Sequence, residues 1–278
     1  MADIKNDYST GLISGYMSDD TDIITDLVTA SGNDLVNNND VTTVTDIQGN
    51  AGDFENSGSA NETLSLASGS EADFRIGGDM TICGWITPES VPTGSAEMWI
   101  VNKYQGSSVR NGYGVAIKAV SGAIHLNIRF ATTADGFSFA NSTTSGIIAA
   151  TRYWVCFVFD TTANKIHFYV NNVLWGSVTP SASLSPGMAT GANEFVVGGQ
   201  SNSTAEEWDG RLAQVLIYDE MISSGYRSGI YNAGAGVPFE ATASPSIKEV
   251  NGLAIASVKS RNGLAIASVK SINGLSNV

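Results

Sequence analysis

Cysteine and proline are scarce in this sequence of 278 residues. The only two cysteines, Cys83 and Cys156, each lie inside an apolar run. A disulfide framework needs more cysteines in a shorter chain, and a structural zinc site needs closely spaced Cys or His pairs, which this sequence does not contain. We therefore expect two buried free thiols and no zinc. The six prolines fall largely between the apolar runs, as the interior of a β-sheet requires.

Positive charge is scarce as well, because 27 Asp and Glu face only 14 Lys and Arg, for a net charge of −13. The deficit lies in residues 1–245, since residues 246–278 carry four Lys or Arg and one Glu. An acidic body repels DNA and RNA phosphates, so we predict no nucleic-acid binding there. No apolar run approaches the roughly 20 residues of a membrane-spanning helix. The start, MADIKNDYST, lacks the basic and apolar segments of a secretory signal, so we expect no export by that route.

What the sequence does contain is a series of short β-prone runs. The clearest are RYWVCFVFD, KIHFYV and VLWGSV, in residues 152–178. Asn171-Asn172 lies where a two-residue hairpin turn needs residues that tolerate positive φ. Side chains alternate along a strand, which gives residues 165–170 one apolar and one polar face and makes residues 152–160 apolar on both. We predict a three-stranded meander whose first strand is buried on both sides.

Similar runs occur along most of the chain. They predict strands at 11–17, 34–41, 79–86, 99–103, 112–119, 123–131, 194–199 and 210–219. Ile222, Tyr226 and Ile230 have the spacing of one helical face, and residues 232–234 would end that short helix. Many short strands and one brief helix favour a two-sheet antiparallel sandwich.

The order of these runs resembles a known superfamily. GLISGYM, GNAGDFEN, ETLSLA, DMTICGWI, IVNKYQG, GYGVAIK, IHFYVNNVLWGS and DGRLAQVLIYDEMISSGYRSGIYNAGAG are similar to the concanavalin A-like lectin/glucanase superfamily, and within it to laminin-G-like and pentraxin-like jelly-roll domains, over roughly residues 8–236. Two motifs depart from the common pattern, because Phe54-Glu55-Asn56 replaces Phe-Asp/Asn-Gly and Asn171-Asn172 replaces Asn-Gly. The resemblance implies a jelly roll whose first and last core strands pair. The predicted fold class is therefore all-β: a two-sheet antiparallel jelly-roll sandwich with one short helix, spanning residues 1–240.

A linker at 241–245 precedes three consecutive eleven-residue repeats, SIKEVNGLAIA, SVKSRNGLAIA and SVKSINGLSNV, at residues 246–278. Each repeat places Asn-Gly, a strong hairpin-turn signal, between segments rich in Val, Ile and Ala. Such apolar β-prone segments need a partner, so we predict a docking or assembly tail; a disordered extension is the alternative. The residues expected to form it are Ile247, Asn251, Gly252, Leu253, Ile255, Val258, Asn262, Gly263, Leu264, Ile266, Val269, Asn273, Gly274 and Leu275.

These repeats resemble C-terminal repeats of bacteriophage structural proteins. That resemblance implies a virion protein assembled in the host cytoplasm, with other virion proteins as its partners through the tail. Self-association into a homo-oligomer is a second way for the tail to be used.

Catalytic patterns are largely absent. Glucanases of this fold carry Glu-x-Asp-x-Glu on one strand, and no such triplet occurs. Two histidines do not support a Ser-His-Asp arrangement. Polysaccharide lyases of related fold use His, Arg, Tyr and an amide on one sheet. His125, Asn127 and Arg129 alternate on one strand, and His167 with Tyr169 would complete the set if they share that sheet, but the lyase motifs as sets are missing. We predict that the protein is not an enzyme.

Ligand binding is the remaining class. Sugar recognition needs an exposed aromatic ring beside planar polar groups. The candidate carbohydrate-binding residues are His125, Asn127, Arg129, His167, Tyr169, Trp175 and Trp208, whereas Trp85 and Trp154 are expected in the core. No cofactor is required. The resemblance to lectin-like domains admits a calcium ion, for which Glu55, Asn56 and Asp209 are candidate oxygen ligands.

The leading hypothesis is a non-enzymatic bacteriophage virion protein, as a capsid decoration or a tail or fibre protein. Its lectin-like domain would serve surface display or contact host glycans, and its repeats would anchor it. A freestanding carbohydrate-binding module is the alternative, and a polysaccharide lyase the third.

Overall fold

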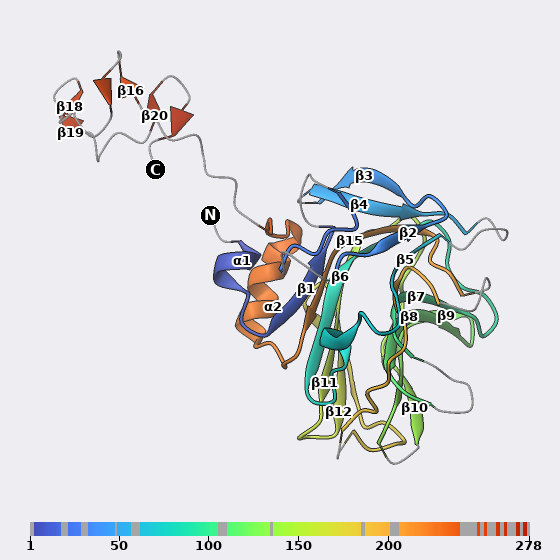
Figure 1. The fold of residues 1–278 in the computed structure, drawn as a ribbon. Coiled ribbons are helices and arrows are strands. Elements are labelled where there is room, and N and C mark those ends of the chain that lie inside the picture. Colours follow the sequence, from blue (N-terminus) through green and yellow to red (C-terminus); the bar gives the residue numbers. More distant parts are fainter. Residues whose placement is uncertain are drawn as a thin grey trace. The chain divides into compact units, whose positions relative to one another are not determined.

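A computed structural model describes residues 3–17, 22–28, 33–47, 49–56, 62–104, 110–133, 136–184, 187–200 and 206–239, and six two-residue strands between 249 and 276. The chain divides into two compact units, residues 2–239 and residues 240–278. The larger unit consists of two antiparallel sheets, as the sequence predicts (Figure 1).

The first sheet, sheet A, has eight strands in the order β13-β12-β11-β6-β15-β4-β3, with β1 paired to β15 as well. Its strands are β1 (Leu12–Tyr16), β3 (Thr42–Asp46), β4 (Gly49–Phe54), β6 (Met80–Pro88), β11 (Tyr153–Asp160), β12 (Lys165–Val170), β13 (Val173–Val178) and β15 (Gly210–Tyr218). The pairing of β1 with β15 joins the first and last core strands, which confirms the jelly-roll prediction.

The second sheet, sheet B, has seven strands in the order β10-β9-β8-β7-β14-β5-β2. Its strands are β2 (Val36–Asn38), β5 (Thr63–Leu66), β7 (Glu97–Asn102), β8 (Tyr113–Val120), β9 (Ala123–Ala131), β10 (Phe137–Asn141) and β14 (Phe195–Val197). The predicted strand at 34–41 is β2, an edge strand.

The main core fills the space between the sheets. Phe157 and Phe159 of β11 meet Ile128 and Phe130 of β9 in this cluster, and all four are buried. Burying an aromatic or aliphatic side chain of this size stabilises the fold by about 1.5–3 kcal/mol. Strand β11 is buried on its other face too, as predicted, because sheet A carries a second apolar cluster on its outer side.

That second cluster lies under two short helices, α1 (Ile4–Asp7) and α2 (Ser224–Tyr231), which lie side by side against the outer face of sheet A (Figure 1). Trp85 and Trp154 are buried there, as predicted, and the Tyr231 ring lies 5.9 Å from each of them. Helix α2 ends at Asn232, which adopts the left-handed conformation and leads into the short 3-10 helix η2 (Asn232–Gly234).

Both cysteines belong to the same outer cluster. Cys83 of β6 and Cys156 of β11 are opposite each other in the strand register, and both are buried and free. Burial raises the pKa of the Cys83 thiol well above its usual value, which keeps it protonated and unreactive. These side chains therefore act as small apolar core residues.

The central meander is confirmed in detail. Strands β11, β12 and β13 pair in succession, and Asn171 and Asn172 have φ values of 49° and 61° between β12 and β13. Both angles fall in the left-handed region, which asparagine tolerates better than most residues. This turn sets the register of β12 against β13.

Some elements were not foreseen. They are the hairpin of β3 with β4, the exposed-edge strand β10, the four-residue helix α1 and a 3-10 helix, η1 (Ala72–Phe74). Among the described residues, no helix has the length and apolar character needed to cross a membrane.

In the smaller unit each repeat forms one antiparallel pair of two-residue strands, as predicted. The pairs are β16 (Glu249–Val250) with β17 (Leu253–Ala254), β18 (Ser260–Arg261) with β19 (Leu264–Ala265), and β20 (Ser271–Ile272) with β21 (Leu275–Ser276). Leu253, Leu264 and Leu275 begin the second strand of their pairs. The other residues predicted for the tail interaction lie outside the described part of the chain.

Candidate functional site

The outer face of sheet B gathers polar side chains from four neighbouring strands. His125, Asn127 and Arg129 point away from the core on β9, because their neighbours Leu126 and Ile128 point into it. In the register, Lys118 of β8 is opposite His125. On the other side, Asn141 and Phe139 of β10 are opposite Asn127 and Arg129 respectively. The structure thus brings the three predicted β9 residues together and adds three that the sequence did not single out.

Glu97 of β7 organises the charges on this face. Its carboxylate is buried and lies 2.6 Å from Lys118 Nζ and 2.7 Å from Arg129 Nη2. The one anion therefore holds two cationic side chains that remain partly exposed, at 17% for Lys118 and 29% for Arg129. A buried carboxylate with two charge-assisted partners fixes both side chains in place.

Hydrogen bonds also fix the amide and imidazole groups. Asn127 is fully buried and donates through Nδ2 to Asn141 Oδ1 at 2.8 Å. That bond fixes the Asn141 amide through its oxygen. His125 Nδ1 lies 2.8 Å from the carbonyl oxygen of Ser142. A carbonyl oxygen only accepts, so Nδ1 donates and Nε2 of the neutral ring is left as an acceptor.

Exposed aromatic rings line one side of these groups. Phe139 is 53% exposed and Phe137 is 40% exposed, both on β10. Lys118 Nζ lies 5.3 Å from the Phe139 ring centre, and the Arg110 guanidinium lies 4.0 Å from the Phe137 ring centre. An apolar ring beside fixed donors and acceptors is the arrangement that sugar binding uses.

A buried tryptophan supports the same face from below. The Trp99 ring lies 5.4 Å from the Arg129 guanidinium, and its Nε1 donates to Glu206 Oε2 at 3.0 Å. A Cβ on Gly114 would come within 2.5 Å of this ring, so the glycine makes room for it. Trp99 and Glu97, two residues apart on β7, thus both contact Arg129.

The prediction that His167 and Tyr169 share this face is wrong. Both lie on β12, in sheet A, and point to the outer side of that sheet. His167 Nε2 lies 3.8 Å from Asp160 Oδ2, and burial lowers the pKa of His167 although Asp160 opposes the shift. The Arg227 guanidinium of α2 covers the Tyr169 ring at 4.1 Å. The alternation of side chains correctly predicted one polar face for β9 and one for β12, but it did not predict that the two strands belong to different sheets.

Of the two tryptophan candidates, the structure buries Trp208 completely and leaves Trp175 partly exposed. Trp208 is fully buried in the main core, where its backbone N–H donates to the carbonyl of Gly198. It precedes β15 directly, so its side chain enters the space between the sheets. Trp175 is half-buried on the edge strand β13 and packs against the same core.

The candidate calcium ligands lie near one another at one end of the sandwich. The backbone N–H of Asn56 donates to Asp209 Oδ1 at 3.4 Å, and that of Glu55 donates to Glu62 Oε2 at 2.8 Å. Partial burial and then the neighbouring carboxylates, Glu89 first among them, raise the pKa of Glu55. Within the described part of the chain, however, no three Asp, Glu, His or Cys side chains converge to hold a metal ion. The assignment of Glu55, Asn56 and Asp209 as calcium ligands stays a prediction, because amide and backbone oxygens also bind calcium.

Glu207 is the most unusual carboxylate of this region. Its side chain is buried, the residue being 1% exposed, and neither carboxylate oxygen has a hydrogen-bond partner. Burial, and then the charge of Glu62, raise the pKa of Glu207 to about 7. No sequence pattern predicts this, because Glu206-Glu207 lies in a stretch that is typical of a solvated loop.

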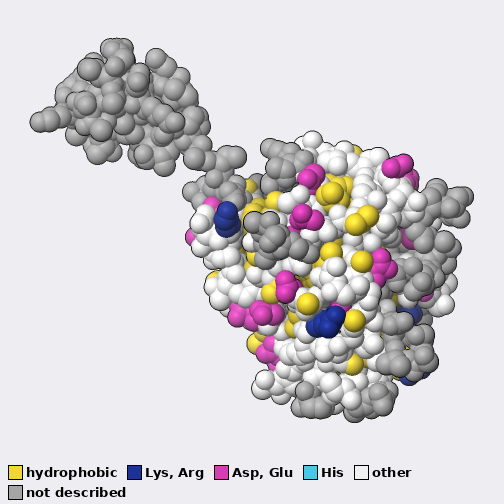
Figure 2. All heavy atoms as spheres, in the orientation of Figure 1, with side chains coloured by type: hydrophobic (Ala, Val, Ile, Leu, Met, Phe, Trp, Pro, Cys, Tyr) yellow, Lys and Arg dark blue, Asp and Glu magenta, His cyan; other side chains and the backbone are white. Residues whose placement is uncertain are grey.

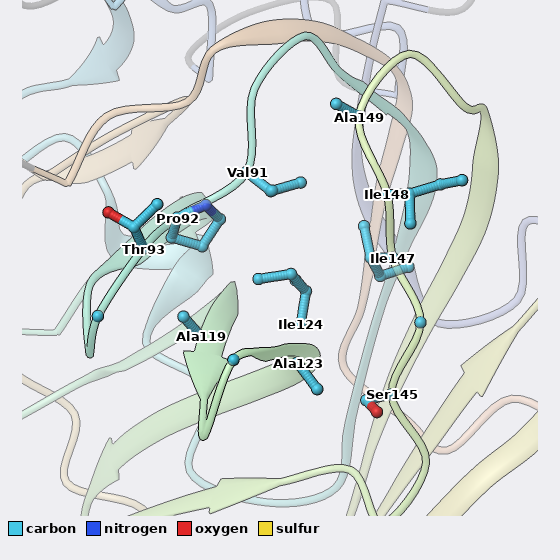
Figure 3. A pocket seen from close by; sticks show the side chains of 13 residues that line it. Val91, Pro92, Thr93, Ala119, Ala123, Ile124, Ser145, Ile147, Ile148 and Ala149 are labelled. Carbon is cyan, nitrogen blue, oxygen red and sulfur yellow. The ribbon is translucent and has the colours of Figure 1, made fainter.

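A separate pocket of about 450 Å³ lies at an end of the sandwich. Three segments enclose it: residues 91–94, residues 119–124 at the β8–β9 turn and residues 145–149 (Figure 3). The side chains of Val91, Ile124 and Ile147 line it, and no charged residue does (Figure 3). A sugar, which presents many hydroxyl groups, would find few partners there, so the outer face of sheet B is the better candidate.

The cations of that face stand out against the rest of the surface. On the side of the main domain seen in Figure 2, Asp and Glu side chains are scattered and Lys and Arg are sparse. Arg110, Lys118 and Arg129 are three of only 14 basic residues in the whole chain. This face is therefore rich in basic residues, although the protein as a whole is acidic.

Three solved structures illustrate the fold. The binding domain of Paraclostridial Mosquitocidal Protein 1 is 14% identical, with a TM-score of 0.59 over 81% of this chain and 52% of its own. The receptor binding domain of botulinum neurotoxin D is 12% identical, with a TM-score of 0.57 over 81% and 53%. The botulinum neurotoxin serotype D ligand binding domain in complex with N-acetylneuraminic acid is 12% identical, with a TM-score of 0.56 over 80% and 50%. At this identity the likeness shows the fold alone, and this chain spans about half the length of each of these structures.

Comparison with families of known sequence is more decisive. No curated protein matches this sequence. The family model described as the concanavalin A-like lectin/glucanases superfamily matches residues 58–225, more than half of the chain. That match covers the strands from β5 to β15, and with them the whole outer face of sheet B described above. Sequence and architecture agree, and the chain belongs to the concanavalin A-like lectin/glucanases superfamily.

Proposed function

We propose that this protein is a non-enzymatic, glycan-binding component of a bacteriophage virion. Its jelly-roll domain contacts carbohydrate on the host surface, and its C-terminal repeats attach it to other virion proteins. The observation that supports glycan binding most strongly is the outer face of sheet B, where fixed polar groups lie beside the exposed Phe139 ring. The named binding domains of two toxins share the fold, which is consistent with a role in recognition.

The non-enzymatic proposal is supported by where the residues considered for a lyase lie. A lyase of the type considered needs a tyrosine beside its histidine, arginine and amide. Tyr169, the residue considered for that role, lies on the other sheet. Tyr104 is the tyrosine near Arg129, but it is 8% exposed, and burial raises its pKa although the charges of Arg110 and Arg129 oppose the shift. Incubation of the protein with uronate polymers should give no rise in absorbance at 235 nm, the signal of the unsaturated product. A sustained rise that His125→Ala abolishes would contradict the proposal.

Glycan binding is tested with an array of bacterial surface polysaccharides and the full chain. We expect binding to a subset of glycans, and we expect Phe139→Ala to weaken it about fivefold, because it removes the exposed ring. The matched control is Leu174→Ala, since Leu174 is equally exposed, at 52%, but lies on sheet A. Silence of the whole array would remove the glycan-binding function.

We expect glycan binding to be the same in EDTA as in calcium. Glu97 is the one carboxylate at the centre of the polar face, and it is already paired with Lys118 and Arg129. A metal ion would have to displace both cations to reach it. The measurement is glycan affinity in buffer with either chelator or calcium chloride, and a loss of binding in EDTA would contradict the expectation.

The virion role is supported by the three repeats, each of which forms a short strand pair. Removing residues 241–278 should abolish association while leaving the jelly roll folded, because all of the described core lies in residues 2–239. Light scattering on the full chain and on the shortened chain, in the same salt, measures this. A full chain that stays monomeric, alone and mixed with lysate of phage-infected cells, would contradict the assembly role.

A further inference from the structure

We propose that the glycan recognised by the outer face of sheet B is acidic, and that Arg129, Lys118 and Asn141 bind the carboxylate of one of its sugar residues while Phe139 packs against the sugar ring. This inference rests on the proposed glycan-binding function and specifies its ligand. The apolar pocket, by contrast, has no charged residue in its lining.

The first argument is the balance of charge on the face. Arg110, Lys118 and Arg129 supply three positive charges. Two carboxylates oppose them, Glu97 between Lys118 and Arg129 and Glu206 on the Trp99 indole. Within the described part of this face, these five side chains therefore sum to a charge of +1, on a protein whose overall charge is −13. An anionic ligand gains attraction there that it would meet on few other surfaces of this protein.

The second argument is geometric. Glu97 is buried, so its carboxylate is beneath Lys118 and Arg129 and leaves their remaining N–H groups directed to the partly exposed side. A guanidinium has five N–H donors and matches a carboxylate through two of them. Arg129 uses Nη2 for Glu97, which leaves other donors of the fork for a ligand. The Glu97 carboxylate thus orients Arg129 and Lys118 and still leaves some of their N–H donors available to a ligand.

The third argument is the position of the ring. Phe139 is directly opposite Arg129 in the β9–β10 register, and opposed residues on one face have Cβ atoms about 4.5–5.5 Å apart. A pyranose ring is close to this size. A sugar that packs on Phe139 therefore presents its carboxylate to Arg129, and Asn141 lies two residues further along β10 on the same face. A neutral sugar would gain no charge-assisted contact from the remaining N–H groups of Arg129 and Lys118.

A sugar ring with a carboxylate can be either a uronic acid within a polymer or a terminal nine-carbon acidic sugar. The experiment uses the full chain and compares oligogalacturonate with its methyl ester, and sialyllactose with lactose, by titration calorimetry. A carrageenan oligosaccharide, which carries sulfates and no carboxylate, serves as a sulfate probe. We expect at least one carboxylate ligand to bind about tenfold more tightly than its uncharged counterpart, the usual worth of one charge-assisted contact. Binding should weaken as salt increases.

Two variants test whether the acidic ligand binds at Arg129. Arg129→Lys keeps the charge beside Glu97 but removes the planar fork, and we expect about a tenfold loss of affinity for the acidic ligand. Arg152→Lys is the matched control, because Arg152 also pairs with a carboxylate, Asp46, and lies over a tryptophan ring, that of Trp85, but on sheet A. The control should bind as the wild type does. Equal melting temperatures of the two variants would show that the loss is not one of folding.

The possible outcomes distinguish failure of the acidic-ligand inference from failure of the glycan-binding function. Equal binding of acidic and uncharged ligands, or binding of the sulfated probe alone, overturns the inference and leaves glycan binding standing. Tight acidic binding that Arg129→Lys and Phe139→Ala leave unchanged also overturns it, because the site then lies elsewhere. Failure of these ligands together with silence on the polysaccharide array removes both.

Discussion

The Lys103→Met variant should melt roughly 10 °C below the wild-type protein, because it breaks a buried ion pair. Lys103 follows β7 and is 1% exposed. Its Nζ donates to the carbonyl oxygens of Gly191 and Asn193 at 2.8 and 3.0 Å and lies 3.4 Å from Glu71 Oε1. Burial lowers the pKa of Lys103 to about 8, with Glu71 opposing the shift, so the ammonium is charged at neutral pH.

Methionine has similar length but donates nothing. The variant leaves two carbonyl oxygens without their donor and leaves the buried Glu71 carboxylate with Arg75 as its remaining cation, at 2.9 Å. Removing one partner of a buried pair costs about 3–5 kcal/mol. For a domain of this size each kcal/mol lowers the melting temperature by about 2–4 °C. Thermal unfolding followed by circular dichroism measures the shift.

Two further variants test the cause. Lys165→Met is the control, because Lys165 donates only to Thr179 Oγ1 at an exposed position, and it should change the melting temperature by no more than about 2 °C. Adding Glu71→Gln to Lys103→Met should recover part of the loss, since the buried charge is then gone. A Lys103→Met protein that melts with the wild type would show that the pair contributes nothing to stability.

The fold was predictable to a large extent because its signals are local. Alternation and β-branched residues marked most strands of both sheets, and the Asn171-Asn172 turn fixed one hairpin. The order of motifs then identified the jelly roll and the pairing of β1 with β15. Alternation does not show which of the two sheets a strand joins. His125 and His167 each lie on a polar face, but of opposite sheets.

Strand β10 explains why half of the candidate site was missed. Its inward residues are Ser138 and Ala140, both small and buried, whereas Phe137 and Phe139 point outward. The usual pattern of apolar inside and polar outside is thus reversed, because Ser138 bonds to Ser181 and needs no apolar partner. A search for alternation detects such a strand but assigns its aromatic residues to the core face. The exposure of Phe137 and Phe139 is itself an indication that the outer face of sheet B binds a ligand.

Glu207→Gln should be more stable than the wild-type protein by about 3 kcal/mol above pH 8, and should show little difference at pH 4. The reason is the buried carboxyl group without hydrogen-bond partners. Burial raises its pKa from 4.5 to about 7 in the folded state. Between these two values the folded protein retains a proton that the unfolded chain has released. Stability therefore falls as the pH rises through this window, and the full cost persists at higher pH.

Glutamine has nearly the same shape and no charge to bury, so the substitution removes that cost where the wild type is ionised. Below pH 4.5 both side chains are neutral and the two proteins should have similar unfolding free energies. Urea denaturation at pH 4, 6 and 8 gives the three differences needed. Glu89→Gln is the matched control, because Glu89 is an exposed carboxylate of the same acidic region. A gap between wild type and Glu207→Gln that does not change with pH would mean that glutamine simply packs better, whereas a gap that opens only between pH 4 and pH 8 ties the cost to the buried charge.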